Sequence, residues 1–389
     1  MQQNISDSIL YIGADDKDLD LFEGQYIVPE GVTYNSYVIL DEKIAVMDSV
    51  DDRKLDVWQE QLESALAGRT PDYMVITHME PDHSSGIEMI MKAYPSIKLV
   101  GNAKTFTILS QLFEVENLAE STIVVKEGDE LSLGEHTLKF FMAPMVHWPE
   151  VMVAYESTSK TLFSADGFGK FGASDAPGGW ACEARRYYYN IVGKYGANVQ
   201  ALLKKLGGVE VATIAPLHGP ILREDIGYYV KMYDMWSRYL PEEDSILIAY
   251  ASIHGNTAKV AHELQTILKA KGKENVEIMD LTRDDMAEAI ENAFYSESLV
   301  LAASSYDAGV FPPMEHYLHH LKSKNFQNRR IGIIENGSWA PTAAKTMKST
   351  LETMKGLTIL EPTVTIRSSY KSTDVAALEA LANALIAKE

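Results

Sequence analysis

The chain has 389 residues, of which 46% are hydrophobic and 23% charged, as is usual for a globular protein. Its formal net charge of −20 argues against binding to nucleic acid or to an anionic membrane, because both would repel it. The sequence has no run of about 18 apolar residues and no basic N-terminal region, so we expect neither a membrane helix nor a secretory signal. The single cysteine, Cys182, excludes an intrachain disulfide and a cysteine-rich metal site, which predicts a reducing, cytoplasmic location.

The length and the hydrophobic pattern predict two domains, residues 1–243 and residues 244–389. The first is an α/β domain with more strands than helices. We expect two strands in 34–50, a helix over 54–68 and a buried strand over 71–78. Further strands are predicted within 98–103, 122–129, 131–145, 151–158, 160–167 and 209–219, with a helix over 197–208. The segment LPEEDS (240–245) is the predicted junction.

The second domain alternates strands and helices regularly. Strands are predicted over 245–250, 276–282, 298–304, 329–335 and 357–367. Helices are predicted over 257–272, 287–293, 315–324, 342–356 and 373–389. Five strands alternating with helices predict a doubly wound parallel sheet, and such sheets bind ligands at the carboxyl ends of their strands.

Four segments of the first domain end an apolar strand with side chains that bind metals. The residues are His78, Glu80, Asp82, His83, His147, Asp166 and His218. Taken singly, a lone histidine is more often structural, Asp82 could cap a helix from Ser84, and Asp166 could lie in a turn. In extended chain neighbouring side chains point apart, so Asp82 and His83 do not easily serve one ion. HMEPDHSSG (78–86) therefore indicates two ligand sets and two ions.

These ligands, in the pattern H-x-[HE]-x-D-H followed by a distant His, Asp and His, are similar to those of the metallo-β-lactamase superfamily. Glu80, the HWP at 147–149, TYNSY (33–37) and EARRYYYNI (183–191) resemble the flavodiiron proteins along the whole chain. The resemblance implies an αββα sandwich followed by a flavodoxin-like five-stranded parallel sheet. It also implies that His78, Glu80 and His147 bind one iron, that Asp82, His83 and His218 bind a second, and that Asp166 bridges them. Three carboxylates suit iron, whereas imidazole suits zinc and iron alike. One of Tyr187, Tyr188 and Tyr189 is expected near this pocket.

The loop S-x-x-G-N-T that follows strand 245–250 resembles the phosphate loop of flavodoxins. Ser252, Asn256 and Thr257 supply donors, Gly255 permits close approach, and Lys259 is misplaced for a nucleoside triphosphate site. A plain turn and helix cap is the alternative. The loops after the third and fourth strands favour FMN, with Tyr306 and Trp339 against its ring. The predicted FMN residues are Ser252, Ile253, His254, Gly255, Asn256, Thr257, Ser304, Ser305, Tyr306, Asp307, Ala308, Gly309, Asn336, Gly337, Ser338, Trp339 and Ala340.

The resemblance implies an oxidoreductase that reduces dioxygen to water, nitric oxide to nitrous oxide, or both, at a non-haem diiron site fed by FMN. The four cysteines of a rubredoxin are absent, so the expected donor is an external rubredoxin or a reductase that feeds one. A head-to-tail homodimer, or a dimer of dimers, is also expected. The alternatives are a di-zinc hydrolase with an accessory flavodoxin-like module, in which bound hydroxide attacks an ester or amide, and an electron carrier with an inactive metal domain.

Overall fold

The computed structural model describes residues 3–115 and 118–387. The chain divides into two compact units between Ser237 and Arg238. The predicted junction, residues 240–245, therefore lies at the start of the second unit, whose first strand β16 (Glu243–Ala251) already begins within it. Among the described residues, no helix is both long and apolar enough to cross a membrane.

The first unit contains two sheets that pack face to face. One has the order β1-β6-β7-β8-β9-β10, and the other has the order β11-β12-β13-β14-β15. Their strands are β1 (Ile9–Tyr11), β6 (Tyr37–Ile39), β7 (Ala45–Met47), β8 (Tyr73–Val75), β9 (Lys98–Gly101), β10 (Thr122–Val124), β11 (Glu130–Ser132), β12 (Thr137–Met142), β13 (Met152–Glu156), β14 (Thr161–Phe163) and β15 (Thr213–Ala215). Apolar side chains from both sheets, such as Val75 and Phe140, form one buried core.

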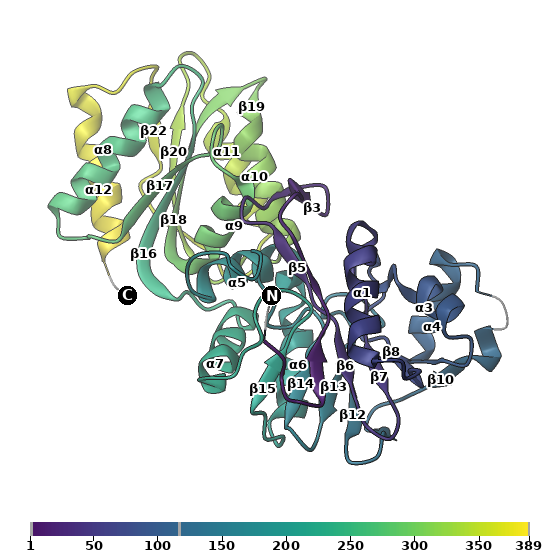
Figure 1. The fold of residues 1–389 in the computed structure, drawn as a ribbon. Helices are drawn as coiled ribbons and strands as arrows, with labels where there is room; N and C mark the ends of the chain where they lie inside the picture. The colour runs from purple at the N-terminus through teal and green to yellow at the C-terminus, as the bar shows by residue number, and fades with distance from the viewer. Residues whose placement is uncertain (1–2, 116–117, 388–389) are drawn as a thin grey trace. The chain divides into compact units, whose positions relative to one another are not determined.

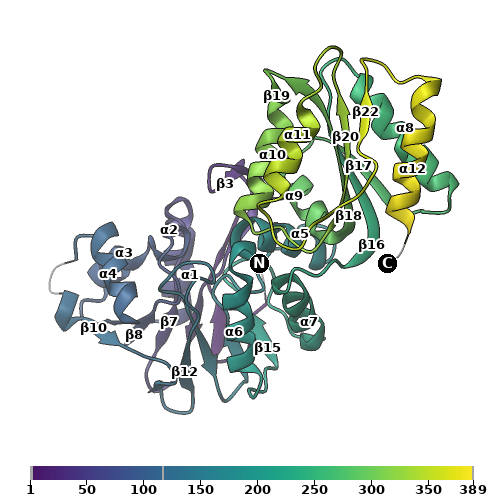
Figure 2. The same cartoon turned by 180° about the vertical axis from the view of Figure 1, so that it is seen from behind.

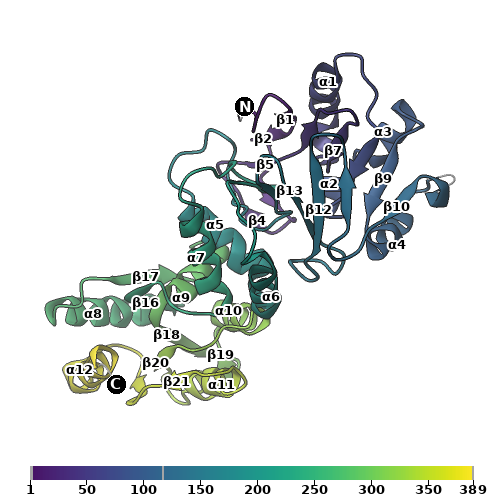
Figure 3. The same cartoon turned by 90° about the horizontal axis from the view of Figure 1, so that it is seen from below.

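Helices cover the outer faces of this sandwich. In Figure 3 the strands lie between α1 (Leu55–Leu66) and α6 (Gly196–Leu206). Helix α1 falls within its predicted range, and α6 begins one residue before the predicted 197–208. The other helices are α2 (Pro81–Ser84), α3 (Ile87–Ala93), α4 (Ala103–Leu112), α5 (Ala181–Tyr187) and α7 (Ile226–Ser237), and α5 continues into a π-helical turn, Tyr188–Val192. Helix α4 was not predicted, although Asn102 and Thr105 form a capping box at its start. Two small ribbons, β2–β5 (Ala14–Asp16, Val32–Tyr34) and β3–β4 (Leu21–Phe22, Tyr26–Ile27), complete the unit.

The second unit is a parallel sheet with the strand order β17-β16-β18-β20-β21, which is the predicted doubly wound architecture. Helices α8 and α12 lie on one face of the sheet, and α9, α10 and α11 lie on the other (Figures 1 and 2). The elements are β17 (Val276–Asp280), β18 (Ser296–Tyr306), β19 (Gly309–Val310), β20 (Arg330–Asn336), α8 (Asn256–Ala270), α9 (Met286–Tyr295), α10 (Pro312–Ser323), α11 (Ala343–Leu351) and α12 (Val375–Ile386).

The last strand of this sheet differs from the prediction. The single strand expected over 357–367 is split into β21 (Thr358–Ile359) and β22 (Val364–Ile366), and both pair with β20. Pro362 lies between the two pieces and has no N–H to donate to a neighbouring strand, which explains the break. The closing helix, predicted to reach residue 389, ends at Ile386; residues 388–389 lie outside the described part of the chain.

Candidate metal centre and flavin pocket

The predicted metal-binding side chains follow the carboxyl ends of strands in both sheets of the first unit. His78 follows β8, His147 follows β12, Asp166 follows β14 and His218 follows β15. Met145 (φ +67°) and Ala165 (φ +50°) adopt the left-handed backbone conformation shortly before His147 and Asp166. This conformation is costly for a residue with a side chain, and it is concentrated at sites where geometry serves function.

The seven predicted residues lie in two adjoining groups. Their potential ligand atoms lie within 4.8 Å of one another in each group; one group is His78, Glu80, His147 and Asp166, and the other is Asp82, His83 and His218. Asp166 faces both. Its Oδ2 lies 2.9 Å from Nε2 of His147, and its Oδ1 lies 3.3 Å from Nε2 of His83. A carboxylate with one oxygen toward each group has the geometry of a bridge between two cations.

The extended-chain argument for residues 78–83 is wrong in one respect. Asp82 and His83 do belong to the same group, because Pro81–Ser84 is a helical turn rather than extended chain. Successive side chains on a helix are about 100° apart, so both can reach one point. Glu80 keeps an extended backbone (ψ 140°) at the start of this turn, which directs it to the other group. Asp82 therefore serves as a member of the cluster rather than as the cap of a helix.

Outer hydrogen bonds orient two of the histidines. The Nδ1 of His78 lies 2.8 Å from Oε1 of Glu150, and the Nδ1 of His218 lies 2.7 Å from the carbonyl oxygen of Thr33. Both oxygens are acceptors, so each Nδ1 carries the proton and donates it. In the neutral ring this leaves a lone pair on Nε2, directed into the cluster. Such outer partners are the usual means of fixing a metal-binding imidazole.

With its histidines neutral, the cluster therefore brings lone pairs of imidazoles and carboxylates together. The Nε2 atoms of His83 and His218 are only 3.1 Å apart, and the Nε2 of His78 faces Oε2 of Glu80 at 3.2 Å. Both carboxylate oxygens of Asp82 and Oδ1 of Asp166 are buried and accept no hydrogen bond from the described residues. Buried acceptors of this kind need a proton or a cation between them. The residues present thus fit two divalent cations.

Without metal ions, the pKa values of these residues also indicate that the cluster stabilises positive charge. Burial alone would lower the pKa of His78, but the nearby Asp166 and Glu150 raise it well above its ordinary value. Against the same effect of burial, hydrogen bonds to Asp166 and Glu80 raise the pKa of His147 to about 9. Burial would raise the pKa of Asp166, yet the charge of His78 and a hydrogen bond with His147 hold it well below its usual range. Cation binding displaces these protons.

TYNSY (33–37) positions the loop that carries His218. The side-chain amide of Asn35 donates to the carbonyl oxygens of Pro216 and Gly219, each at 2.8 Å, and the Tyr37 hydroxyl donates to Pro216 O at 3.1 Å. Thr33 accepts from the backbone N–H of Gly219 through its hydroxyl oxygen. The segment therefore contributes no ligand of its own and instead fixes a histidine about 180 residues later in the chain.

Of the three tyrosines named in the sequence, Tyr187 lies beside the metal cluster. Its ring centroid is 5.5 Å from that of His218, and its buried hydroxyl has no hydrogen-bond partner among the described residues. Burial, followed by the charges of Asp166 and Glu80, raises the pKa of this phenol well above its ordinary value, so it stays protonated. It is available as a hydrogen-bond donor to a small molecule at the site.

A small cavity of about 260 Å³ reaches two of the candidate ligands, Glu80 and Asp82. Its remaining lining residues are Leu19, Leu21, Phe22, Glu23, Tyr34, Asp51 and Pro81. The β3–β4 ribbon supplies part of this wall and is tied to the α5 region, because the Tyr26 hydroxyl donates to the carbonyl oxygen of Asn190 at 3.0 Å. The volume and the mixture of apolar and acidic lining favour a small uncharged ligand over a large or anionic one.

The second unit has a cavity of about 750 Å³ at the carboxyl ends of its strands. The predicted FMN residues line it, except Gly255 and Gly309, which lie in the same loops. Gly255 (φ +81°) directly precedes α8 in a conformation that favours glycine. The hydroxyl of Ser252 is buried without a hydrogen-bond partner among the described residues, and the first turn of α8 has no acidic side chain. A helix N-terminus with an unpartnered hydroxyl suits a phosphate.

The structure adds a fourth loop to this cavity that the sequence reading missed. Ser368 (φ +68°), just after β22, lines the cavity together with Thr342. The side-chain amide of Asn336 donates to the carbonyl oxygen of Ser368 and accepts from its N–H, so this side chain is occupied in joining two loops. Ser305 likewise accepts from the N–H groups of Thr342 and Ala343, at the start of α11. The flavin loops are thus braced against one another.

The aromatic side chains at this cavity are exposed. Trp339 is 91% exposed and Tyr306 is 45% exposed, so packing within this unit does not account for Trp339. A planar apolar ligand in the cavity would cover part of this surface, which is consistent with an isoalloxazine ring.

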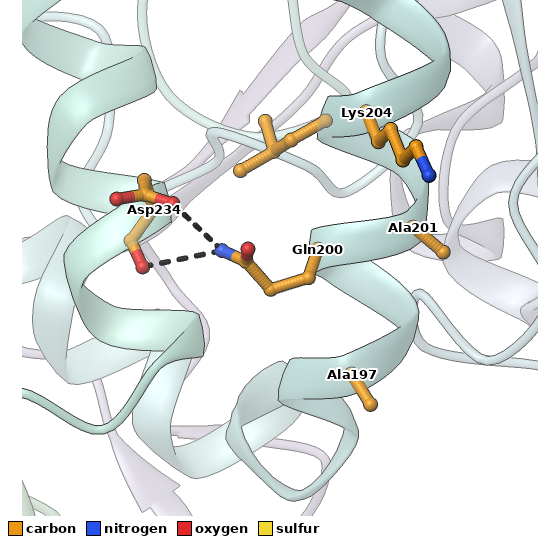
Figure 4. A pocket seen from close by; sticks show the side chains of 6 residues that line it. Ala197, Gln200, Ala201, Lys204 and Asp234 are labelled. Carbon is orange, nitrogen blue, oxygen red and sulfur yellow. Dashed lines mark hydrogen bonds between the residues drawn. The ribbon is translucent and has the colours of Figure 1, made fainter.

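A further cavity, of about 620 Å³, lies between α6 and α7 and differs from the two sites above. Its lining has one carboxylate, Asp234, and the side-chain amide of Gln200 donates to that carboxylate at 2.9 Å (Figure 4). Ala197, Ala201 and Lys204 of α6 also line it (Figure 4). The paired amide and carboxylate join the two helices and leave no free cluster of ligand atoms.

Known proteins are similar to this chain along most of its length. Residues 32–219 match the family model of ODP family beta lactamases. The chain is 28% identical to a nitric oxide reductase of Moorella thermoacetica, over 93% of this chain and 92% of that one. It is 30% identical to diflavin flavoprotein A 1 of Synechocystis, over 76% of this chain but only 52% of that longer protein. The solved rubredoxin oxygen:oxidoreductase of Desulfovibrio gigas matches with a TM-score of 0.92 at 25% identity, covering 99% of this chain and 98% of that one.

The fold and the sites define a metallo-β-lactamase-like metal domain joined to a flavodoxin-like domain. The chain belongs to the family of flavodiiron proteins.

The contact between Glu150 and His78 generates a test of the metal centre. Glu150→Gln should weaken metal retention about 10–100-fold, the usual effect of removing an outer partner of a metal-binding histidine. Glu150→Ala should weaken it more. Metal content after dialysis against a graded chelator measures the effect, with Glu130→Gln, an exposed change in the same unit, as control. Unchanged retention in both Glu150 variants would remove Glu150 from the site.

The buried, unpartnered hydroxyl of Ser252 generates a test of the flavin pocket. Ser252→Ala should lower the affinity of the flavin-depleted protein for FMN by about 10–150-fold, because one hydrogen bond to a charged group contributes roughly 1.5–3 kcal/mol. It should leave affinity for riboflavin, which lacks the phosphate, within twofold. Fluorescence titration with each flavin measures this difference. An equal loss for both flavins would place the phosphate elsewhere.

Proposed function

We propose that this chain is an oxidoreductase that reduces dioxygen to water, nitric oxide to nitrous oxide, or both. Two irons at the seven-residue cluster and FMN in the second unit are its cofactors. The observation that supports this most is Asp166, which turns one oxygen toward each of two ligand groups that together contain three carboxylates. Carboxylates are hard anionic donors, and they favour iron over a zinc site built mainly from histidine.

The proposed ligand roles follow the two groups. His78, Glu80 and His147 hold one iron, Asp82, His83 and His218 hold the other, and Asp166 bridges them. When bound, FMN would relay electrons from the external donor, and the irons would provide the place where the small oxidant binds. The chain itself orients the ligands, and the Tyr187 hydroxyl offers a hydrogen bond beside them. The small cavity at Glu80 and Asp82 admits a diatomic molecule and disfavours the bulky esters or amides of a hydrolase.

The electron donor proposed is a rubredoxin, or a reductase that feeds one. This chain has one cysteine, so it contains no four-cysteine iron site of its own. The proposed location is a reducing cytoplasm, on the same count of cysteines. A head-to-tail homodimer, in which the FMN of one copy serves the irons of the other, completes the proposal.

The choice between redox and hydrolytic chemistry rests on the metal and on Glu80. The purified protein should contain about two irons and one FMN per chain and should consume dioxygen or nitric oxide from a reduced donor. Glu80→His should lower iron retention and abolish this turnover, because a neutral imidazole replaces an anionic donor. Glu60→His, on the exposed face of α1, is the matched control.

Three measurements decide the matter: elemental analysis, the flavin spectrum and gas consumption with each substrate. Zinc without flavin in the purified wild-type protein would favour the di-zinc hydrolase instead. Full turnover in Glu80→His would refute the role assigned to Glu80.

The head-to-tail dimer generates a complementation test. A variant without FMN and a Glu80→His variant should each be inactive, yet a mixture that has exchanged subunits should recover part of the activity. Each mixed dimer would contain one intact pair of centres contributed by two copies. Light scattering establishes the dimer. An active monomer, or the absence of recovery in demonstrated mixed dimers, would contradict this assembly.

A further inference from the structure

Helix α10 carries three histidines on its outer side. They are His316, His319 and His320, spaced i, i+3 and i+4, so they lie on one face of the helix. His316 and His319 are exposed, and His320 is half-buried. The opposite face of α10 buries Met314, Tyr317, Leu318 and Leu321. These histidines belong to neither the metal centre of the first unit nor the residues that line the flavin cavity.

Two of the three histidines place ring nitrogens at the separation expected for two ligands of one metal ion. The Nε2 atoms of His316 and His320 are 2.9 Å apart, and their rings are inclined at 67°. Metal–imidazole bonds are about 2.0–2.1 Å long, so two such bonds at 90° place their nitrogens about 2.9 Å apart, and a tetrahedral angle places them about 3.4 Å apart. The observed separation matches two adjacent positions of an octahedral or square-planar ion.

The pair is held on a rigid support. The buried face of α10 anchors the helix, and the Tyr317 hydroxyl donates to the carbonyl oxygen of Ala289 in α9 at 3.0 Å. Among the described residues, no acidic side chain forms an ion pair with His316 or His320, so a cation would meet no competing carboxylate contact there. The net charge of −20 raises the local concentration of cations around the molecule.

We propose that His316 and His320 form a second metal site, which binds one divalent transition ion through two adjacent imidazoles, with water at its other positions. The geometry and the general order of affinities favour Cu²⁺ first, then Ni²⁺, with tetrahedral Zn²⁺ weaker. His319 is left out of the proposed pair, since among the described residues the close contact between ring nitrogens on this face joins His316 and His320. This site is independent of the reaction at the metal centre.

The alternative for the same geometry is a hydrogen bond between two neutral imidazoles, Nε2–H to Nε2, with no affinity for metal. Metal titration distinguishes the two. The untagged protein, with its own metal centre and flavin filled and in the oxidised state, is titrated with Ni²⁺ by calorimetry and with Cu²⁺ by electron paramagnetic resonance. The variants are His316→Ala and His320→Ala. His319→Ala is the matched control, because it removes an exposed histidine from the same helix face.

The wild-type protein and His319→Ala should bind one additional ion per chain, with Cu²⁺ showing hyperfine coupling to two imidazole nitrogens. His316→Ala and His320→Ala should each bind Ni²⁺ at least about tenfold more weakly, since even an outer partner of a metal ligand contributes 10–100-fold. Circular dichroism confirms that the variants are folded. Equal Ni²⁺ affinity in all four proteins, or an equal loss in His319→Ala, would overturn the proposal.

Discussion

The metal centre depends on one electrostatic constraint: lone pairs of imidazole nitrogens and carboxylate oxygens point into the same buried space. Glu150 and the Thr33 carbonyl each accept a hydrogen bond from the Nδ1–H of a histidine, so in the neutral rings the unprotonated Nε2 turns inward. There they meet carboxylate oxygens and other imidazoles. Without positive charge this arrangement repels itself, and burial makes the repulsion stronger. The strand ends, the helical turn at 81–84 and the left-handed residues hold it together.

The two packed sheets position metal ligands that no single segment of the chain could bring together. Each sheet contributes part of the cluster, and the apolar core between the two sheets fixes the distance between their ends. TYNSY (33–37) shows how this precision is reached, since it places no ligand but holds the Pro216–Gly219 loop by three side chains. In the second unit, Ser305 and Asn336 perform the same task for the flavin loops. Ligand side chains are thus supported by neighbours that are themselves held by hydrogen bonds.

Sequence patterns identified the candidate ligands because strand ends are readable from apolar runs. They also predicted the parallel sheet of the second unit, because its strands and helices alternate clearly. They could not reveal Glu150, which follows HWP without any spacing that marks an outer hydrogen bond. Ser368 was missed because residues 357–367 read as one strand, which hid the loop. The turn at 81–84 was misread because local chain geometry there follows from Pro81 and from tertiary packing rather than from apolar periodicity.

Two ligands of the second group lie far apart in the sequence, and this separation has a consequence for the order of folding and metal binding. His83 and His218 are separated by 135 residues, yet their Nε2 atoms almost touch. A cation cannot find both in an unfolded chain without closing a very long loop, and the loss of chain entropy precedes any bond it gains. The second ligand group is therefore assembled by the folded sandwich and not by the ion. Metal loading should accordingly be a late event that locks a finished domain rather than one that nucleates it.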